Sequence, residues 1–208
     1  MPIPKTKSPE GLEAAVARLR EGGVVALPTD TLYALVALAR DAAAVDRVFA
    51  IKGREPGKPL PLFVDSIEMA DAIAFVTHAA RRLASRFWPG ALTLVLHKRP
   101  GFDSEALTGG DTVALRVPDS DVILHAVRAL GEPVTATSAN LSGGPDPDTA
   151  AQVRRQLGDL VDLVVDAGPC PIAAPSTIVD CTTDEPRILR PGAIPDPQIH
   201  AALLKEPS

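Results

Sequence analysis

Two kinds of apolar segment alternate along this chain, and their alternation is the feature that most constrains its fold. Short runs of Val, Leu and Ile, bounded by Pro or Gly, are typical of buried strands. Longer segments, such as residues 11–21, carry apolar side chains at helical spacing. Only 3% of the residues are aromatic, so the core has to be built from aliphatic side chains. The pattern indicates a sheet covered by Ala-rich helices.

The alternation predicts seven or so strands interleaved with helices. We expect helices over residues 11–21, 41–51, 67–75, 79–87, 122–130, 149–157 and 198–204, and strands over 24–27, 60–64, 92–97, 113–117, 134–137, 163–165, 177–179 and 188–189. The late strands follow one another without helices, so part of the sheet should be antiparallel. The prediction is an α/β fold, with helices packed on one twisted, mixed parallel and antiparallel sheet. No repeat or linker divides the chain, so we expect a single domain over residues 1–208, with its core at about 11–195.

Charge and composition exclude several classes of protein. The net charge of −5 argues against a protein that coats nucleic acid by bulk attraction. The two cysteines, Cys170 and Cys181, form neither a disulfide framework nor a metal-ligand spacing, and the four histidines are isolated. The first residues lack the apolar stretch of a signal peptide, and no apolar run is long enough to span a membrane. We therefore expect a cytoplasmic protein with no membrane contact and no dedicated metal site.

Polar and cationic side chains collect where the predicted strands end, which is where open α/β sheets bind ligands. They include Thr31, Lys52, Arg54, Lys58, Arg116, Ser138, Asn140, Ser176 and Arg190. Guanidinium groups hold phosphate or carboxylate oxygens through paired hydrogen bonds, and lysine acts as a movable point charge. Neither a Walker A nor a Rossmann glycine motif occurs. The residues alone therefore indicate an anion-binding α/β domain.

Each of these segments also has a purely structural interpretation. The KGR triplet at 52–54 could be a solvated helix end, where cations complement the helix dipole. The Ser and Asn of residues 138–140 could form hydrogen bonds within a turn. Arg116 ends an apolar strand and needs an anionic partner, which could be a ligand or the nearby Asp111 or Asp119. Spacing alone leaves these alternatives open.

Seven motifs, read in order, resemble the threonylcarbamoyl-AMP synthase family, which contains the YrdC-like domain. They are PTDTLY at 28–33, KGR at 52–54 with PL at 59–60, WPGALT at 88–93, VALRVP at 113–118, SANLSG at 138–143, PSTIVD at 175–180 and LRPGAI at 189–194. Each motif is weak, but seven in this order over residues 11–195 are specific. The chain resembles the short, single-domain form of the family, without a C-terminal extension.

The resemblance implies an enzyme, a nucleotidyltransferase that condenses L-threonine, bicarbonate and ATP into threonylcarbamoyl-AMP and releases pyrophosphate. Mg²⁺ would be carried on the triphosphate, since the sequence contains no carboxylate cage. The product would pass to a threonylcarbamoyl-transfer complex that modifies adenosine beside the tRNA anticodon, and a weak tRNA contact is compatible with this role. The alternative is a paralogous module of the same fold that binds double-stranded RNA or tRNA without synthase activity.

The resemblance also implies roles for individual residues. The catalytic group around the phosphates would be Lys52, Arg54, Ser138 and Asn140. ATP would be bound by Arg54, Lys58, Thr112, Ser138, Asp146 and Arg190. L-threonine would be bound by Thr31, Arg116, Ala136 and Ser176.

Two segments depart from the family pattern. Tyr33 is followed by Ala34-Leu35-Val36, where the family often has Gly-Leu-Gly. Glycines there could admit a ligand close to the backbone, so their loss bears on the shape of the pocket. Phe63 stands where a histidine is often found, which bears on how threonine is held.

Overall fold

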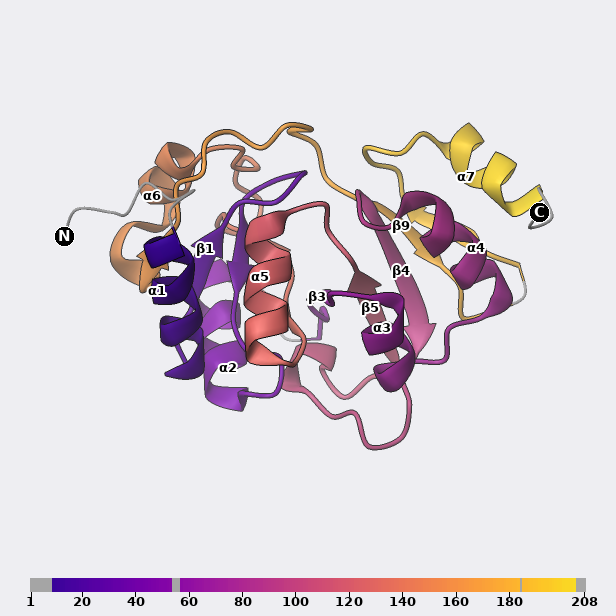
Figure 1. Ribbon diagram of the computed structural model, residues 1–208, viewed down its shortest axis with the longest axis horizontal. Helices are drawn as coiled ribbons and strands as arrows, with labels where there is room; N and C mark the ends of the chain where they lie inside the picture. Colours follow the sequence, from indigo (N-terminus) through magenta and orange to yellow (C-terminus); the bar gives the residue numbers. More distant parts are fainter. Residues whose placement is uncertain (1–8, 54–56, 184, 205–208) are drawn as a thin grey trace.

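The strands of the described chain, residues 9–53, 57–183 and 185–204 of the computed structural model, form two sheets (Figure 1). The larger sheet contains, in spatial order, β10 (Arg187–Arg190), β9 (Thr177–Asp180), β4 (Leu92–His97), β5 (Thr112–Arg116), β3 (Leu62–Phe63) and β6 (Val134–Thr135). The smaller sheet contains β7 (Thr137–Ser138), β2 (Ala34–Val36), β1 (Val25–Leu27) and β8 (Leu163–Val164). Both sheets mix parallel and antiparallel pairs, which confirms the predicted α/β class.

The two sheets meet at Ala136. The strand predicted over residues 134–137 is divided there into β6 and β7, which belong to different sheets. The Ala136 N–H donates to the carbonyl oxygen of Pro61 at 2.8 Å, and the Thr135 N–H donates to Ala37 at 2.9 Å. The backbone of residues 135–136 thus makes hydrogen bonds toward both sheets. The strands therefore form two sheets, where the sequence predicted one.

Seven helices of the described chain connect and cover these strands (Figure 1). They are α1 (Pro9–Arg20), α2 (Ala42–Lys52), α3 (Ile67–Ile73), α4 (His78–Phe87), α5 (Asp121–Leu130), α6 (Ala150–Leu157) and α7 (Asp196–Leu204), with short 3₁₀ turns at Glu105–Leu107 and Gly158–Leu160. Asp41, Ser66, Thr77, Ser120 and Thr149 cap helix starts by accepting backbone N–H groups. The predicted helices therefore start where polar caps stand in the sequence.

The core is aliphatic, as the composition requires. One cluster packs α1 and α5 against β1 and β2, and a larger cluster joins the remaining helices to the larger sheet and to other residues of β1 and β2. Among the largest fully buried side chains, all are leucines except Tyr33 and Phe102. Burying a Leu side chain stabilises the fold by about 1.5–3 kcal/mol, so each of these leucines contributes substantially to stability.

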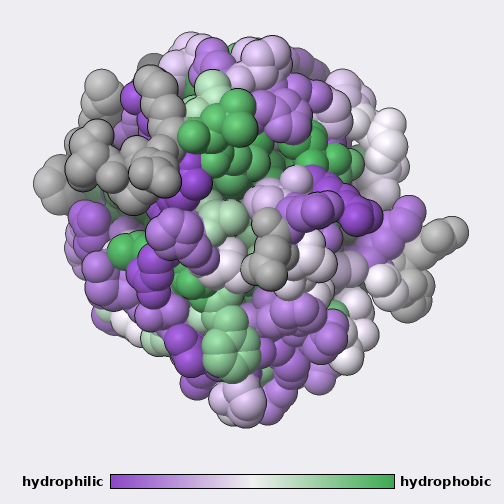
Figure 2. All heavy atoms as spheres, turned by 90° about the vertical axis from the view of Figure 1, so that its right-hand side faces the viewer, coloured by the Kyte–Doolittle hydropathy of each residue, from purple (hydrophilic) through white to green (hydrophobic). Residues whose placement is uncertain are grey.

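The surface beside α4 and α7 is mostly hydrophilic, with smaller apolar areas between the polar groups (Figure 2). There α7 packs on α4, and Arg82 of α4 donates a hydrogen bond to the Ala202 carbonyl at 3.2 Å. The longest of the described helices, α1, has 12 residues. Within the described ranges, no helix has the length and apolar character needed to cross a membrane.

Candidate functional site

A cleft of about 960 Å³ lies where the two sheets meet. One wall is the face of the larger sheet, from Phe63 on β3 to Arg190 on β10. The other wall contains Ala34 on β2, Ser138 on β7 and the end of α2. Because strand ends and a helix end converge here, the cleft brings together side chains that are far apart in the sequence.

The structure places most of the predicted site residues in this one cleft. Those that line it are Thr31, Lys52, Lys58, Arg116, Ala136, Ser138, Asn140, Asp146, Ser176 and Arg190. Arg54 lies outside the described residues. Thr112 is not among the lining residues, because it starts β5 whereas Arg116 ends it. The two are four residue steps apart along the strand, a separation of roughly 13 Å.

Lys52 is the centre of a buried polar network at the end of α2. Its Nζ atom donates to Asn140 Oδ1 at 2.5 Å and to the Ser138 carbonyl at 2.8 Å. The Ser138 hydroxyl also donates to Asn140 Oδ1, at 2.7 Å. Lys52 is only 5% exposed, so the interpretation of this lysine as a solvated helix end is wrong. The network presents a fixed positive charge and a hydroxyl to the cleft.

Local backbone geometry positions this network. Gly53 follows Lys52 in the left-handed conformation, with φ of 55°, and ends α2 there. The Ser142 N–H then donates to the Lys52 carbonyl at 2.8 Å, which ties the loop after β7 to the helix end. The Asn140 amide is held in turn by the Gly144 carbonyl at 2.8 Å. The Ser-Ala-Asn segment is thus a turn whose side chains also face the cleft.

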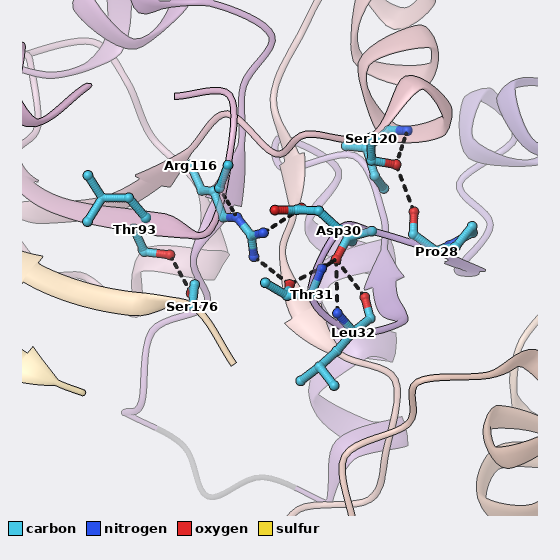
Figure 3. Close-up of polar contacts among 12 residues, drawn as sticks. Pro28, Asp30, Thr31, Leu32, Thr93, Arg116, Ser120 and Ser176 are labelled. Atoms are coloured by element: carbon cyan, nitrogen blue, oxygen red, sulfur yellow. Dashed lines mark hydrogen bonds and ion pairs between the residues drawn. The ribbon is translucent and has the colours of Figure 1, made fainter. Parts of the chain in front are cut away.

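Arg116 is held from three directions at the end of β5 (Figure 3). Its guanidinium donates to Asp30 Oδ1 at 2.6 Å, to Thr31 Oγ1 at 2.8 Å and to the Gly90 carbonyl at 2.8 Å. The ring of Phe63 lies 5.8 Å from the guanidinium carbon, within cation–π range. The internal anionic partner is therefore Asp30, and neither Asp111 nor Asp119, the two candidates near in sequence, pairs with it. Those neighbours are close in sequence, but Asp30 is brought in by the turn after β1.

The charge state of Arg116 follows from two opposed effects. Burial lowers the pKa of the Arg116 guanidinium, and the adjacent Asp30 carboxylate opposes this shift. Arginine starts from so high a pKa that it stays protonated. A guanidinium has five N–H donors, and three of them are used here. The remaining donors suit one carboxylate or phosphate group.

Arg190 and Thr93 both contact Ser176. The guanidinium of Arg190 donates to the Ser176 carbonyl at 2.7 Å and to its hydroxyl at 3.1 Å. The hydroxyls of Thr93 and Ser176 lie 2.8 Å apart (Figure 3). Partial burial lowers the pKa of Arg190, and the Asp146 carboxylate opposes that shift. Ser176 thus has cationic and hydroxyl neighbours on two sides.

Close backbone packing makes the Arg190–Ser176 contact possible. A Cβ atom on Gly192 would lie 2.5 Å from the Pro175 carbonyl oxygen and 2.5 Å from the Ser176 carbonyl carbon. Only glycine lets the segment after β10 approach so closely. The glycine of the LRPG motif is therefore needed to seat Arg190 on Ser176.

Sequence reasoning missed Thr93, which lines the cleft, and Asp30, which holds Arg116 in place. Asp30 lies in the PTDTLY motif and Thr93 in the WPGALT motif. Both motifs were identified, but only Thr31 was given a role from them. Thr93 is a single polar residue between Leu92 and Leu94, which is a signal that the sequence offers. Asp30 stands between two threonines, so its burial, at 4% exposed, is evident only from the structure.

Oxygen donors for a metal ion are sparse in the cleft. Within the described ranges, no three His, Cys, Asp or Glu side chains gather as a metal site. Asp146 lines the cleft, and its Oδ1 atom lies 3.4 Å from the Asn140 amide nitrogen. This donor set fits a cation that brings most of its ligands with it, as one bound to phosphates does.

Comparison with known proteins gives the family. The Sua5/YciO/YrdC family model, described as "Telomere recombination", matches residues 17–192. A threonylcarbamoyl-AMP synthase of Bacillus subtilis is 42% identical over 200 residues, which cover 95% of this chain and 58% of that protein. A putative threonylcarbamoyl-AMP synthase of Mycobacterium tuberculosis is 39% identical over 194 residues, covering 93% of this chain and 89% of that protein.

The fold comparison agrees with the sequence comparison. The crystal structure of Pyrococcus abyssi Sua5 complexed with L-threonine superposes with a TM-score of 0.89 at 38% identity. It covers 93% of this chain and 57% of the Sua5 chain. The chain thus spans less than three fifths of the length of its B. subtilis and P. abyssi relatives. The resemblance carried by the seven motifs is confirmed: this chain belongs to the Sua5/YciO/YrdC family.

Proposed function

We propose that this chain is an enzyme that condenses L-threonine, bicarbonate and ATP into threonylcarbamoyl-AMP, with release of pyrophosphate. The observation that carries the proposal is that one cleft contains two distinct anion-binding groups. Arg116 with Ser176 forms one, and Lys52 with Ser138 and Asn140 forms the other. A carboxylate and a triphosphate are the two anions that this reaction must hold side by side. The names of the B. subtilis and M. tuberculosis relatives support the same activity.

The threonine half would be built on Arg116. Its spare N–H donors would take the substrate carboxylate, and Thr31 and Ser176 would add hydroxyls. Ala136 would contribute its backbone carbonyl, since its N–H is already bonded to Pro61. The P. abyssi relative crystallised with L-threonine supports this choice of amino acid.

The ATP half would be built on the Lys52 network. Lys52 and Ser138 would contact the phosphates, with Asn140 holding both in place. Further contacts are proposed for Arg54, Lys58, Asp146 and Arg190. A contact is also proposed for Thr112, which does not itself line the cleft but stands two residues along β5 from the cleft-lining Ala114. Mg²⁺ would arrive on the triphosphate, with Asp146 as the nearest carboxylate of the cleft wall, and would neutralise phosphate charge.

The reaction has two bond-forming steps. The neutral threonine amine forms a C–N bond with the carbon of bicarbonate-derived carbon dioxide and loses one proton, which gives a carbamate. A carbamate oxygen then bonds to the α-phosphorus while the bond from that phosphorus to the β-phosphate oxygen breaks and pyrophosphate leaves. The chemistry is therefore adenylyl transfer, the work of a nucleotidyltransferase. The chain's part is to align the two anions and to stabilise the developing negative charge through fixed cations such as Lys52.

The alternative, an RNA-binding module without synthase activity, fits the cleft less well. Contacts to a phosphate backbone need exposed cations, whereas Lys52 and Arg116 are each 5% exposed. We propose that any tRNA contact is secondary and that the product passes to a threonylcarbamoyl-transfer complex. The proposed location is the cytoplasm, which suits the two free cysteines, Cys170 and Cys181.

The test is pyrophosphate release by the purified chain with ATP and Mg²⁺. We expect release only when both L-threonine and bicarbonate are present. Arg116→Lys should raise the KM for L-threonine and change the KM for ATP little, because lysine can pair with Asp30 but lacks the planar fork. Arg54→Ala should mainly raise the KM for ATP. Release of orthophosphate in place of pyrophosphate, or pyrophosphate release that does not depend on L-threonine, would refute the proposal.

A further inference from the structure

Thr93 lies in the cleft next to Arg116, with its hydroxyl facing Ser176 (Figure 3). Leu94 pairs with Leu115 across β4 and β5, so Thr93 and Arg116 occupy neighbouring positions on the two adjacent strands. Thr93 is 3% exposed and Ser176 7% exposed. A buried hydroxyl pair beside a guanidinium that has spare donors is thus part of the cleft wall.

Counting protons fixes what this hydroxyl pair can offer a ligand. Each hydroxyl has one proton, and the 2.8 Å bond between Thr93 and Ser176 uses one of the two. Arg190 can only donate, so its 3.1 Å contact occupies an acceptor site on Ser176 Oγ. In the part of the chain that the structure describes, no other acceptor bonds either hydroxyl. One O–H proton therefore remains, whichever of the two residues donates to the other.

We infer that Thr93 is a further positioning residue of the threonine half: its hydrogen bond with Ser176 fixes the orientation of the hydroxyl pair, so that the remaining O–H proton faces the substrate carboxylate. The inference rests on the proposed function. L-threonine binds with its amine as an ammonium group, which cannot accept the remaining proton until it is deprotonated for the reaction, whereas a carboxylate oxygen can. Arg116 lies beside the pair and supplies the charge, so the carboxylate would receive N–H donors from β5 and an O–H donor from the Thr93–Ser176 pair.

The substrate's own β-hydroxyl is also an acceptor, so the test separates it from the carboxylate. L-2-aminobutyrate has the carboxylate and the amine of L-threonine but lacks the hydroxyl. Dissociation constants of both amino acids would be measured by calorimetry for the wild type, Thr93→Val and Thr93→Ser. Valine keeps the branched shape without the O–H group, and serine keeps the O–H group without the methyl.

We expect Thr93→Val to raise the dissociation constants of both amino acids by the same factor. The expected factor is about three- to tenfold, which is the effect of one hydrogen bond. Thr93→Ser should stay within about twofold of the wild type, and the KM for ATP should not change in either variant. Wild-type affinities in Thr93→Val would overturn the inference. A loss confined to L-threonine would also overturn it, because the donor would then serve the β-hydroxyl. If the wild-type chain neither binds L-threonine nor releases pyrophosphate, the proposed function is refuted, and this inference is refuted with it.

Discussion

Arg190 donates hydrogen bonds to both the carbonyl oxygen and the hydroxyl of Ser176, at 2.7 and 3.1 Å. Arg190 is proposed for ATP and Ser176 for L-threonine, so this contact joins the two halves of the cleft. Arg190 also adds to the lowering of the pKa of Arg116, because the two positive charges repel each other. A change at Arg190 should therefore be felt in both halves of the cleft.

The first prediction concerns this coupling. Arg190→Lys keeps the charge but loses the planar pair of Nε and Nη2, which both donate to the Ser176 carbonyl while Nη2 also donates to its hydroxyl. We expect the KM values for ATP and for L-threonine both to rise, by roughly tenfold each. The matched control is Arg187→Lys, an exposed position on the same strand, which should change neither. Steady-state kinetics with each substrate varied in turn measures both values, and a rise in only one of them would show that the halves are not joined through Arg190.

The second prediction concerns Lys52. Lys52→Met keeps the apolar stem and removes the amine, which leaves the Asn140 side-chain oxygen and the Ser138 carbonyl short of a donor. The free energy of unfolding should fall by about 1–3 kcal/mol. The kcat should fall on the order of a hundredfold or more, with L-threonine affinity unchanged.

Urea titration and single-turnover kinetics at a temperature where the variant is folded separate these two effects. Arg47→Met is the control. Arg47 makes an ion pair with Asp162, and the side chains of the two are 44% and 35% exposed. Exposed pairs contribute at most about 1 kcal/mol, so its activity should not change. A Lys52→Met enzyme with wild-type kcat would mean that the network is structural only.

The third prediction concerns Gly192. A methyl group there would collide with the backbone of Pro175 and Ser176. Gly192→Ala should therefore displace Ser176 and raise the KM for L-threonine. Gly109→Ala is the matched control, since Gly109 has a left-handed φ of 77° with open space around it. That variant should lose about 1 kcal/mol of stability and retain wild-type kinetics. Equal kinetics for both variants would contradict the role given to the LRPG segment.

The fourth prediction concerns alkaline pH. Burial raises the pKa of Cys170 from 9.0 to about 11 and that of Cys181 from 9.0 to about 12. The folded chain therefore holds these thiol protons more tightly than the unfolded chain does. Their contribution to stability is fully present below pH 9 and is lost as the pH rises from there towards the folded values. Urea unfolding between pH 8 and 10.5 should show a steeper loss of stability for the wild type than for a Cys170→Ala, Cys181→Ala double variant, and parallel curves would contradict it.

The secondary structure was largely predictable because its signals are local. Apolar periodicity and capping residues such as Ser120 and Thr149 mark the helices directly in the sequence. The strand Ala34–Val36 was missed, because three residues are too few to show a period. The division of the strand at Ala136 was missed as well, because pairing with two sheets depends on distant partners.

The residues that line the cleft were largely predictable from the sequence, but the contacts between charged side chains were not. Motif order indicated Lys52, Asn140, Arg116 and Ser176, and the structure brings them together. The partner of Arg116 lies 86 residues away in the sequence, at Asp30. Such contacts are set by the order of strands in the sheets, and a sequence neighbour such as Asp119 gives no guide to them. Proximity along the chain therefore offered only Asp111 and Asp119 as internal partners, and the fold supplies a different one.

The most direct measurement follows carbon-13-labelled bicarbonate into product by mass spectrometry, with ATP, Mg²⁺ and the purified chain. If the cleft holds the threonine carboxylate at Arg116 and the triphosphate at Lys52, threonylcarbamoyl-AMP should form with one labelled carbon, together with pyrophosphate, and only when L-threonine is present. AMP and pyrophosphate formed without a labelled adduct, or in equal amounts with and without L-threonine, would contradict it.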